Sequence, residues 1–194
     1  MTDSSLFLII NGWAGKISAI DEFFKGLSND YFAIMVGCLV LIWLWFSGRT
    51  PEARARNQKS VIAAAISIGF TCALVGIVNH FYFRPRPFID LPGGSVNMLF
   101  YRPTDSSFPS NFASIMFAFV VPVMFYNKKF GLGLLVLALV SSFGRIYTGV
   151  HYPLDIASGA VIAVVAGFLA LGMTRLLKPF LYYLFIFLRK VKIA

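Results

Sequence analysis

Long apolar runs constrain this chain more than any other feature of its sequence. They occupy residues 31–46, 61–83, 112–126, 131–147 and 156–177. A helix of about 20 apolar residues spans the hydrocarbon core of a bilayer, and a helix bonds all of its own backbone groups where no water is present. Only 13% of the residues are charged, against about a quarter in a soluble domain. We therefore predict an all-α, polytopic membrane helix bundle with five transmembrane helices, formed as one domain over residues 1–194.

The two ends of the chain show weaker patterns. Residues 6–27 repeat apolar side chains at intervals of three and four between polar ones, which predicts an amphipathic helix. This N-terminal helix would lie in the membrane interface or pack against the bundle. Residues 179–188 are apolar but too short to cross a bilayer alone, so we expect a kinked extension or an interfacial tail that ends in Arg189, Lys190 and Lys192.

The basic residues predict an orientation in the membrane. Five spans place residues 48–59, residues 127–130 and the C-terminus on one side, together with most of the 17 lysines and arginines. The positive-inside rule makes that side cytoplasmic. The net charge of +9 then reflects membrane topology, and we expect no nucleic-acid partner. The predicted location is the plasma membrane, with several passes and a cytoplasmic C-terminus.

A polar stretch between the last two spans is the strongest functional signal. It contains Arg145, His151 and Asp155. Ionisable groups at the end of a span usually line a polar cavity or bind a charged ligand. Pro153 suits the first turn of a helix, which would place Asp155 close enough to hold the His151 imidazole and stabilise a charged ring. The helix N-terminus and the Arg145 guanidinium are both suited to phosphate oxygens.

Further basic residues lie on the predicted external side, against the general trend. Arg84 and Arg86 alternate with prolines that end the second span, and Arg102 follows in the same connection. Ser110 or Asn111 would cap the third span. Because these arginines lie on the same side as His151, we predict a shared anionic ligand at the external face.

Three motifs give the sequence a family resemblance. They are residues 82–88, which read Tyr-Phe-Arg-Pro-Arg-Pro-Phe, residues 107–110, which read Ser-Phe-Pro-Ser, and residues 144–155, in which Gly-Arg precedes His-Tyr-Pro-Leu-Asp. In order and spacing the chain resembles the membrane-bound type-2 phosphatidic acid phosphatases, and most closely their bacterial undecaprenyl-pyrophosphate phosphatase branch. The family motifs are Lys-x6-Arg-Pro, Pro-Ser-Gly-His and Ser-Arg-x5-His-x3-Asp.

The resemblance implies a role for each matching residue. His151 would attack phosphorus to form a phosphohistidine, and Asp155 would orient it. Arg86, Arg145 and Ser110 would bind the phosphoryl oxygens, with Asn111 beside them and with help from Arg84. The mechanism would need no cofactor and no metal, and the chain shows no Cys, His and carboxylate grouping at metal-ligand spacing.

The sequence departs from the family at three positions. Asn79 stands where the family has lysine, and Gly144 replaces the serine before the arginine. Phe112 replaces the histidine that protonates the leaving oxygen and later activates water, and phenylalanine carries no proton. We consider His80, four residues before Arg84, and Asp105 as substitute proton carriers.

The loss of the histidine favours one class of substrate. A diphosphate expels a phosphate monoester with a second pKa of about 6, which leaves without an acid. We therefore predict removal of the terminal phosphate of undecaprenyl pyrophosphate, with membrane lipids surrounding the substrate. Three alternatives remain: a phosphatase of another lipid phosphate such as phosphatidylglycerol phosphate, a binder or transporter without turnover, and a phosphotransferase. The sequence makes no prediction of oligomeric state.

Overall fold

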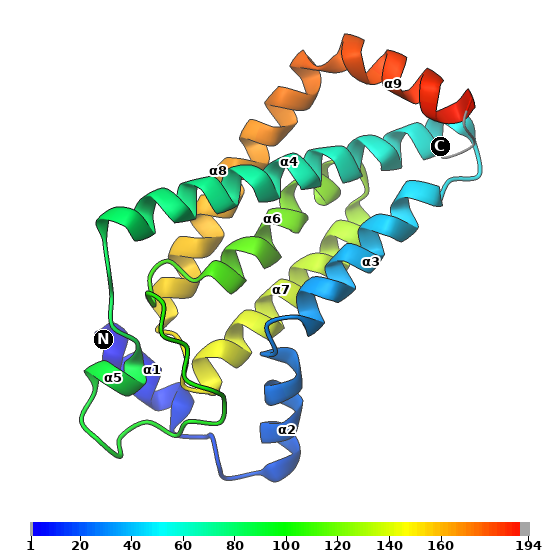
Figure 1. The fold of residues 1–194 in the computed structure, drawn as a ribbon. Helices are drawn as coiled ribbons and strands as arrows, with labels where there is room; N and C mark the ends of the chain where they lie inside the picture. The colour runs from blue at the N-terminus through cyan, green and yellow to red at the C-terminus, as the bar shows by residue number, and fades with distance from the viewer. Residues whose placement is uncertain (1, 191–194) are drawn as a thin grey trace.

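The structure is a computed structural model that describes residues 2–190, and it is an all-α bundle (Figure 1). Within these residues the chain forms no β-strand, which confirms the predicted fold class. The helices are α1 Asp3–Asn11, α2 Ser18–Leu27, α3 Phe32–Phe46, α4 Pro51–Phe81, α5 Pro87–Asp90, α6 Asn111–Tyr126, α7 Lys128–Tyr147, α8 Pro153–Leu176 and α9 Lys178–Lys190.

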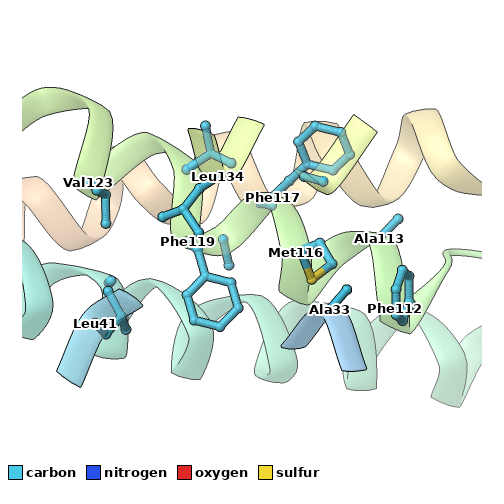
Figure 2. Packing of buried hydrophobic residues seen from close by; sticks show 14 of the residues in the cluster. Ala33, Leu41, Phe112, Ala113, Met116, Phe117, Phe119, Val123 and Leu134 are labelled. Atoms are coloured by element: carbon cyan, nitrogen blue, oxygen red, sulfur yellow. The ribbon is translucent and has the colours of Figure 1, made fainter. Parts of the chain in front are cut away.

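Helix α6 forms the centre of the bundle and packs against α4, α7 and α8. Most of its side chains are buried, including Phe112, Met116 and Phe119 (Figure 2). Phe119 points toward α3, where a Cβ atom at Gly37 would lie 2.9 Å from the phenylalanine ring. Small residues allow membrane helices to approach closely in this way, because packing rather than burial from water drives their association.

By length and composition, fewer helices of the described chain qualify as membrane spans than the five predicted. Helices α4, α7 and α8 are each long and apolar enough to cross a membrane. Helices α2 and α3, bent by 53° at the break between them, would make a fourth if they form one broken span. Helix α6 is apolar but has only 16 residues. The count of five spans therefore stays a prediction.

The charged residues 48–59 lead us to expect a polar loop between the first two spans, and this expectation is wrong over most of its length, because helix α4 already begins at Pro51. Thr50 caps this helix by accepting a hydrogen bond from the Ala53 amide at 3.2 Å, and Glu52 lies in the first turn. These are normal helix-start signals. At 31 residues, α4 extends about 46 Å, so its basic first turns project beyond a hydrocarbon core of about 30 Å.

The N-terminal segment forms two helices instead of the single amphipathic helix expected over residues 6–27. They separate at a turn in which Gly15 has a φ of 84°, a conformation that glycine adopts without strain. Both helices pack against α7, which agrees with the alternative of a segment docked on the bundle. Trp13 nevertheless stays 62% exposed, as expected of an aromatic residue at headgroup level.

Helix α9 turns away from the end of α8 and runs back toward the start of α4 (Figure 1). Leu181 and Phe185 are buried, and they line a hollow together with Ala55 and Lys59 of α4. The expected tail is therefore a helical extension folded back on the bundle. The predicted final residue Lys192 and the C-terminus lie outside the described residues.

Candidate active site

The polar motifs meet at one end of the bundle, which we call the site end. Helices α4 and α7 end there, and α6 and α8 begin there (Figure 1). The connections at residues 82–110 and 148–152 cover this end. Since helices α4, α6, α7 and α8 pack against one another, motifs far apart in the sequence are held side by side.

A sharp turn after α7 places His151. Gly149 has a φ of 90°, and a Cβ atom there would lie 3.1 Å from the carbonyl oxygen of Asn97, so glycine suits both the backbone and the space. The amide of Val150 donates to the carbonyl of Arg145 at 3.0 Å and closes the turn. The His151 side chain is only 3% exposed as a result.

The hydrogen-bond partners of His151 determine its tautomer. Nδ1 lies 3.0 Å from the carbonyl oxygen of Ser107, which only accepts hydrogen bonds, so Nδ1 carries the hydrogen. Nε2 lies 3.2 Å from Nη1 of Arg86, a donor, and is therefore the bare nitrogen. This tautomer is assigned from these partners. It leaves the Nε2 lone pair facing the arginine that would bind a phosphoryl group.

Asp155 lies in the first turn of α8, as predicted from Pro153, and it is completely buried. Its carboxylate accepts from the Ser107 hydroxyl at 2.5 Å and from the Tyr152 amide at 2.8 Å. The distance from its Oδ2 to Nδ1 of His151 is 3.6 Å, too long for a hydrogen bond. Asp155 therefore acts on His151 through its charge and by holding Ser107, whose carbonyl binds the imidazole.

Burial lowers the pKa of His151 to about 4. Asp155 opposes this shift, whereas the positive charges of Arg86 and Arg145 add to it. The side chain is consequently neutral at physiological pH. A neutral imidazole is the nucleophilic form of histidine.

Arg86 is buried and connects His151 to Asp105. Its Nη1 donates to the Val150 carbonyl at 3.0 Å, and its Nη2 donates to Oδ1 of Asp105 at 2.8 Å. The other carboxylate oxygen of Asp105 accepts from Asn111 at 3.3 Å. The Asp105 side chain is 54% exposed. The structure therefore brings this predicted proton carrier next to the histidine site, where water can reach it.

Arg145 lies between two aromatic rings and is only 2% exposed. Its Cζ atom is 4.2 Å from the ring centre of Phe112 and 5.1 Å from that of Phe100. Its Nη2 pairs with the carboxylate of Asp30, and its buried Nε has no hydrogen-bond partner among the residues that the structure describes. The Phe112 ring thus stacks on the guanidinium, an attractive contact between a cation and an aromatic face.

Tyr101 donates a hydrogen bond to the second oxygen of Asp30. This bond to a carboxylate, together with partial burial, raises the pKa of Tyr101 to about 12. The hydroxyl therefore stays protonated over the physiological range and keeps donating to Asp30.

Arg84 is part of the polar cluster. It donates to Asp155 at 2.7 Å and to Asp3 of α1 at 2.7 Å, and its Cζ lies 4.1 Å from the Tyr152 ring centre. Two carboxylates thus occupy this arginine. It therefore joins Asp155 of α8 to Asp3 of α1.

Ser110 is the N-cap of α6, which confirms one of the two residues predicted for this cap, Ser110 and Asn111. Its hydroxyl accepts from the Ala113 amide at 3.3 Å, and its own amide donates to the Asp155 carbonyl at 3.0 Å. The start of α6, where Ser110 was expected to bind phosphoryl oxygens, is therefore tied directly to the first turn of α8.

Three of the sequence candidates are not joined to this cluster in the described part of the chain. Arg102 is exposed, and its Cζ atom lies 5.8 Å from the Phe88 ring centre. His80 is exposed, and its ring stacks edge-on against Phe81; among residues 2–190 it shows no polar contact with the His151 environment. Asn79 lines a cavity of about 360 Å³ between α4 and α6, which Asn111 also lines. Its buried Oδ1 has no hydrogen-bond partner in the described part of the chain.

The Gly144 departure has a steric cause. A Cβ atom at Gly144 would lie 2.6 Å from the hydroxyl oxygen of Ser28 and 3.2 Å from the Phe24 ring. The end of α2 therefore fills the space that a serine at this position would need.

The sequence analysis missed the residues that hold the arginines and the histidine: Asp3, Asp30, Tyr101 and Ser107. Each lies far from its partner in the sequence, and Asp30 is separated from Arg145 by 115 residues. One signal was available. Arginines at the end of a membrane bundle need carboxylates on the same side, and of the eight acidic residues only Glu52 lies on the opposite side.

Comparison with known proteins matches residues 60–178 to the PAP2 superfamily. The chain belongs to this family of membrane lipid phosphatases. It is 30% identical to undecaprenyl-diphosphatase BcrC of Bacillus subtilis, over 90% of this chain and 86% of that protein. It is 31% identical to the bacitracin transport permease protein BcrC of Bacillus licheniformis, over 82% and 74% of the two chains. The crystal structure of Aquifex aeolicus LpxE has a similar fold, with a TM-score of 0.69, 28% identity and coverage of 87% of this chain and 93% of that one.

Proposed function

We propose that this phosphatase removes the terminal phosphate of undecaprenyl pyrophosphate at the external face of the plasma membrane, with His151 as the nucleophile. The observation that carries the proposal is the imidazole itself. It is buried and neutral, its Nδ1 is bonded to Ser107, and its bare Nε2 lies 3.2 Å from Arg86. The names of its undecaprenyl-diphosphatase relatives support the choice of substrate.

In the first step, Nε2 of His151 attacks the terminal phosphorus. The bond from phosphorus to the bridging oxygen breaks, and the lipid leaves as a monophosphate that needs no proton from the protein. The new N–P bond leaves a positively charged ring, because Nδ1 keeps its hydrogen. Asp155, with its oxygen 3.6 Å from Nδ1, stabilises that charge. Arg86 and Arg145 bind the phosphoryl oxygens.

In the second step, water attacks the phosphorus of the phosphohistidine. We assign Asp105 as the group that takes the proton, because it is exposed to water and bonded to Arg86. The N–P bond then breaks, inorganic phosphate leaves and His151 returns to its neutral form. We do not assign His80 as the proton acceptor, because its side chain is exposed and its ring contacts Phe81.

The decisive experiment measures phosphate release from undecaprenyl pyrophosphate by purified protein in detergent, with EDTA present. We expect turnover by the natural chain and none by His151→Ala. His80→Ala is the matched control, since it removes the other histidine of the chain without touching the cluster, and it should keep its activity. Loss of activity in both histidine variants would contradict the assignment of the nucleophile.

Two features favour a second candidate function, a lipid-phosphate binder or transporter without turnover. Phenylalanine stands at position 112, where the family has its proton-carrying histidine, and one relative is named a transport permease. This alternative predicts lipid binding that survives His151→Ala, with no phosphate released by either protein. A phosphatase of another lipid phosphate predicts instead that phosphatidylglycerol phosphate is cleaved faster than the diphosphate.

A further inference from the structure

Every arginine of the site is already paired with at least one carboxylate. Arg84, Arg86 and Arg145 form ion pairs with four aspartates, namely Asp3, Asp30, Asp105 and Asp155. With His151 neutral, three positive and four negative charges leave the cluster with a net charge of −1. An anionic substrate is therefore not drawn to free positive charge; it has to replace carboxylates that the arginines already hold.

The four aspartates differ in how easily they can be replaced. The side chain of Asp155 is completely buried, and Asp3 shares Arg84 with it. Asp30 and Asp105, by contrast, are 33% and 54% exposed and are each the partner of one of the arginines that face the phosphoryl position. A carboxylate at the surface can turn into water at low cost, because water solvates it when the ion pair opens.

Asp30 is the more constrained of these two. Its oxygens are shared between Arg145 and the Tyr101 hydroxyl, and Arg145 is held between the rings of Phe112 and Phe100. A buried guanidinium needs an anionic partner at all times. Any ligand that takes the place of Asp30 must therefore bind Arg145 more strongly than a carboxylate that also receives a tyrosine hydrogen bond.

We propose that Asp30 is a specificity-determining residue: it holds Arg145 until a doubly charged phosphoryl group replaces it, and so excludes the singly charged phosphodiester groups of the surrounding lipids. A phosphodiester offers Arg145 the same charge as Asp30 and leaves Asp30 and Tyr101 to be resolvated, so it gains nothing. A terminal phosphate above its second pKa of about 6 carries twice that charge. The proposal rests on the proposed function for its assignment of Arg145 to the phosphoryl group.

Binding of soluble anions tests this without any turnover. The probes are orthophosphate at pH 8, a dianion, and dimethyl phosphate, a monoanion, and the readout is the rise in melting temperature of the detergent-solubilised protein. We expect phosphate to stabilise the natural chain and dimethyl phosphate to have little effect. In Asp30→Asn an anion no longer has to displace a carboxylate from Arg145, so the dissociation constant of dimethyl phosphate should fall by about fivefold or more. Dimethyl phosphate should then also stabilise the protein.

Asp90→Asn is the matched control. Asp90 also accepts a hydrogen bond from a tyrosine, Tyr152, at 2.8 Å, but it forms no ion pair with an arginine in the described structure. Its replacement should leave the affinity for dimethyl phosphate unchanged. Tyr101→Phe keeps the Asp30 charge and removes only the hydrogen bond that supports it. This variant should lower the dissociation constant of dimethyl phosphate by a smaller amount, and it serves if Asp30→Asn does not fold.

The proposal is wrong if Asp30→Asn, or Tyr101→Phe where that variant must serve, binds dimethyl phosphate no more tightly than the natural chain. It is also wrong if both anions weaken together, which would show that Asp30 only positions Arg145. Because the measurement uses binding alone, a protein that binds selectively but releases no phosphate would contradict the proposed function and leave the role of Asp30 intact.

Discussion

His151 illustrates how the environment of one residue determines its chemistry. The same burial that lowers its pKa to about 4 keeps its nucleophilic form populated across the physiological range. Free histidine has a pKa near 6.5 and would be half protonated just below neutral pH. The sequence predicted the residue from its place beside Pro153 and Asp155. It did not predict the Ser107 carbonyl that fixes the tautomer, because that contact joins residues 44 positions apart.

The titration of His151 can be observed directly. The chain has two histidines, so His80→Gln leaves one imidazole to be followed by ¹⁵N NMR. We expect a midpoint near 4, well below the ordinary histidine value. In the unfolded chain the ring takes up a proton near pH 6.5, so the native state should lose stability as the pH falls from 6.5 toward 4. A further His151→Gln change should remove that part of the pH dependence; a midpoint at or above 6.5 would contradict the assigned environment.

The effect of having phenylalanine instead of a proton-carrying histidine at position 112 can be tested. We expect Phe112→His to raise the cleavage of a lipid phosphomonoester by about a hundredfold, since a positioned acid contributes on that order when the leaving group is an alcohol. Cleavage of the diphosphate should change much less. Parallel rates on the two lipids measure this difference, and an equal effect on both would show that the leaving group does not explain the phenylalanine.

At the scale of helices, the sequence predicted where helices begin better than it predicted which helices pack together. Ser110 and Pro153 mark the beginnings of α6 and α8 because caps and first-turn prolines act locally. The same signals at Thr50 and Pro51 were outweighed by the charged residues that follow, and the start of α4 was missed. The packing of α2 against Gly144 left no pattern at all, since it depends on a space between helices that only the assembled bundle defines.

Gly144 should therefore be intolerant of a side chain. Gly144→Ala would place a methyl group 2.6 Å from the Ser28 hydroxyl, and we expect a loss of about 1–3 kcal/mol in the free energy of unfolding. Ser28→Ala removes the obstructing oxygen and should restore most of that loss. Gly133→Ala on the same helix, where a Cβ atom meets no other atom within 4 Å, is the control and should be neutral. Melting temperatures in detergent measure all three.

At the scale of the molecule, the first helix is tied to the loops around His151. The buried Asn11 side chain donates to the carbonyls of Asn97 and Tyr147, at 2.9 and 2.8 Å, and accepts from the Asn97 amide at 2.8 Å. Asp3 at the start of the same helix binds Arg84. These contacts join α1, the connection after α5 and the end of α7 into one unit around His151.

Asn11→Ala should disconnect that unit. It leaves buried backbone groups without partners, and we expect a loss of about 2–3 kcal/mol in stability together with lower phosphatase activity. Thr2→Ala is the comparison, because Thr2 caps α1 at its exposed end without contacting the loops, and it should cost about 1 kcal/mol or less with activity unchanged. Equal effects of the two changes on activity would argue against α1 as a support of the site.

The pairing of arginines with carboxylates also affects how a substrate is found. A cluster with nearly balanced charge produces little electric field beyond a few ångströms, so it does not steer anions from solution as an open basic cleft would. Lipid diphosphates would arrive by lateral diffusion within the leaflet, and the arginines would act only at contact. Catalytic efficiency should accordingly depend on the density of substrate in the membrane far more than on the ionic strength of the medium.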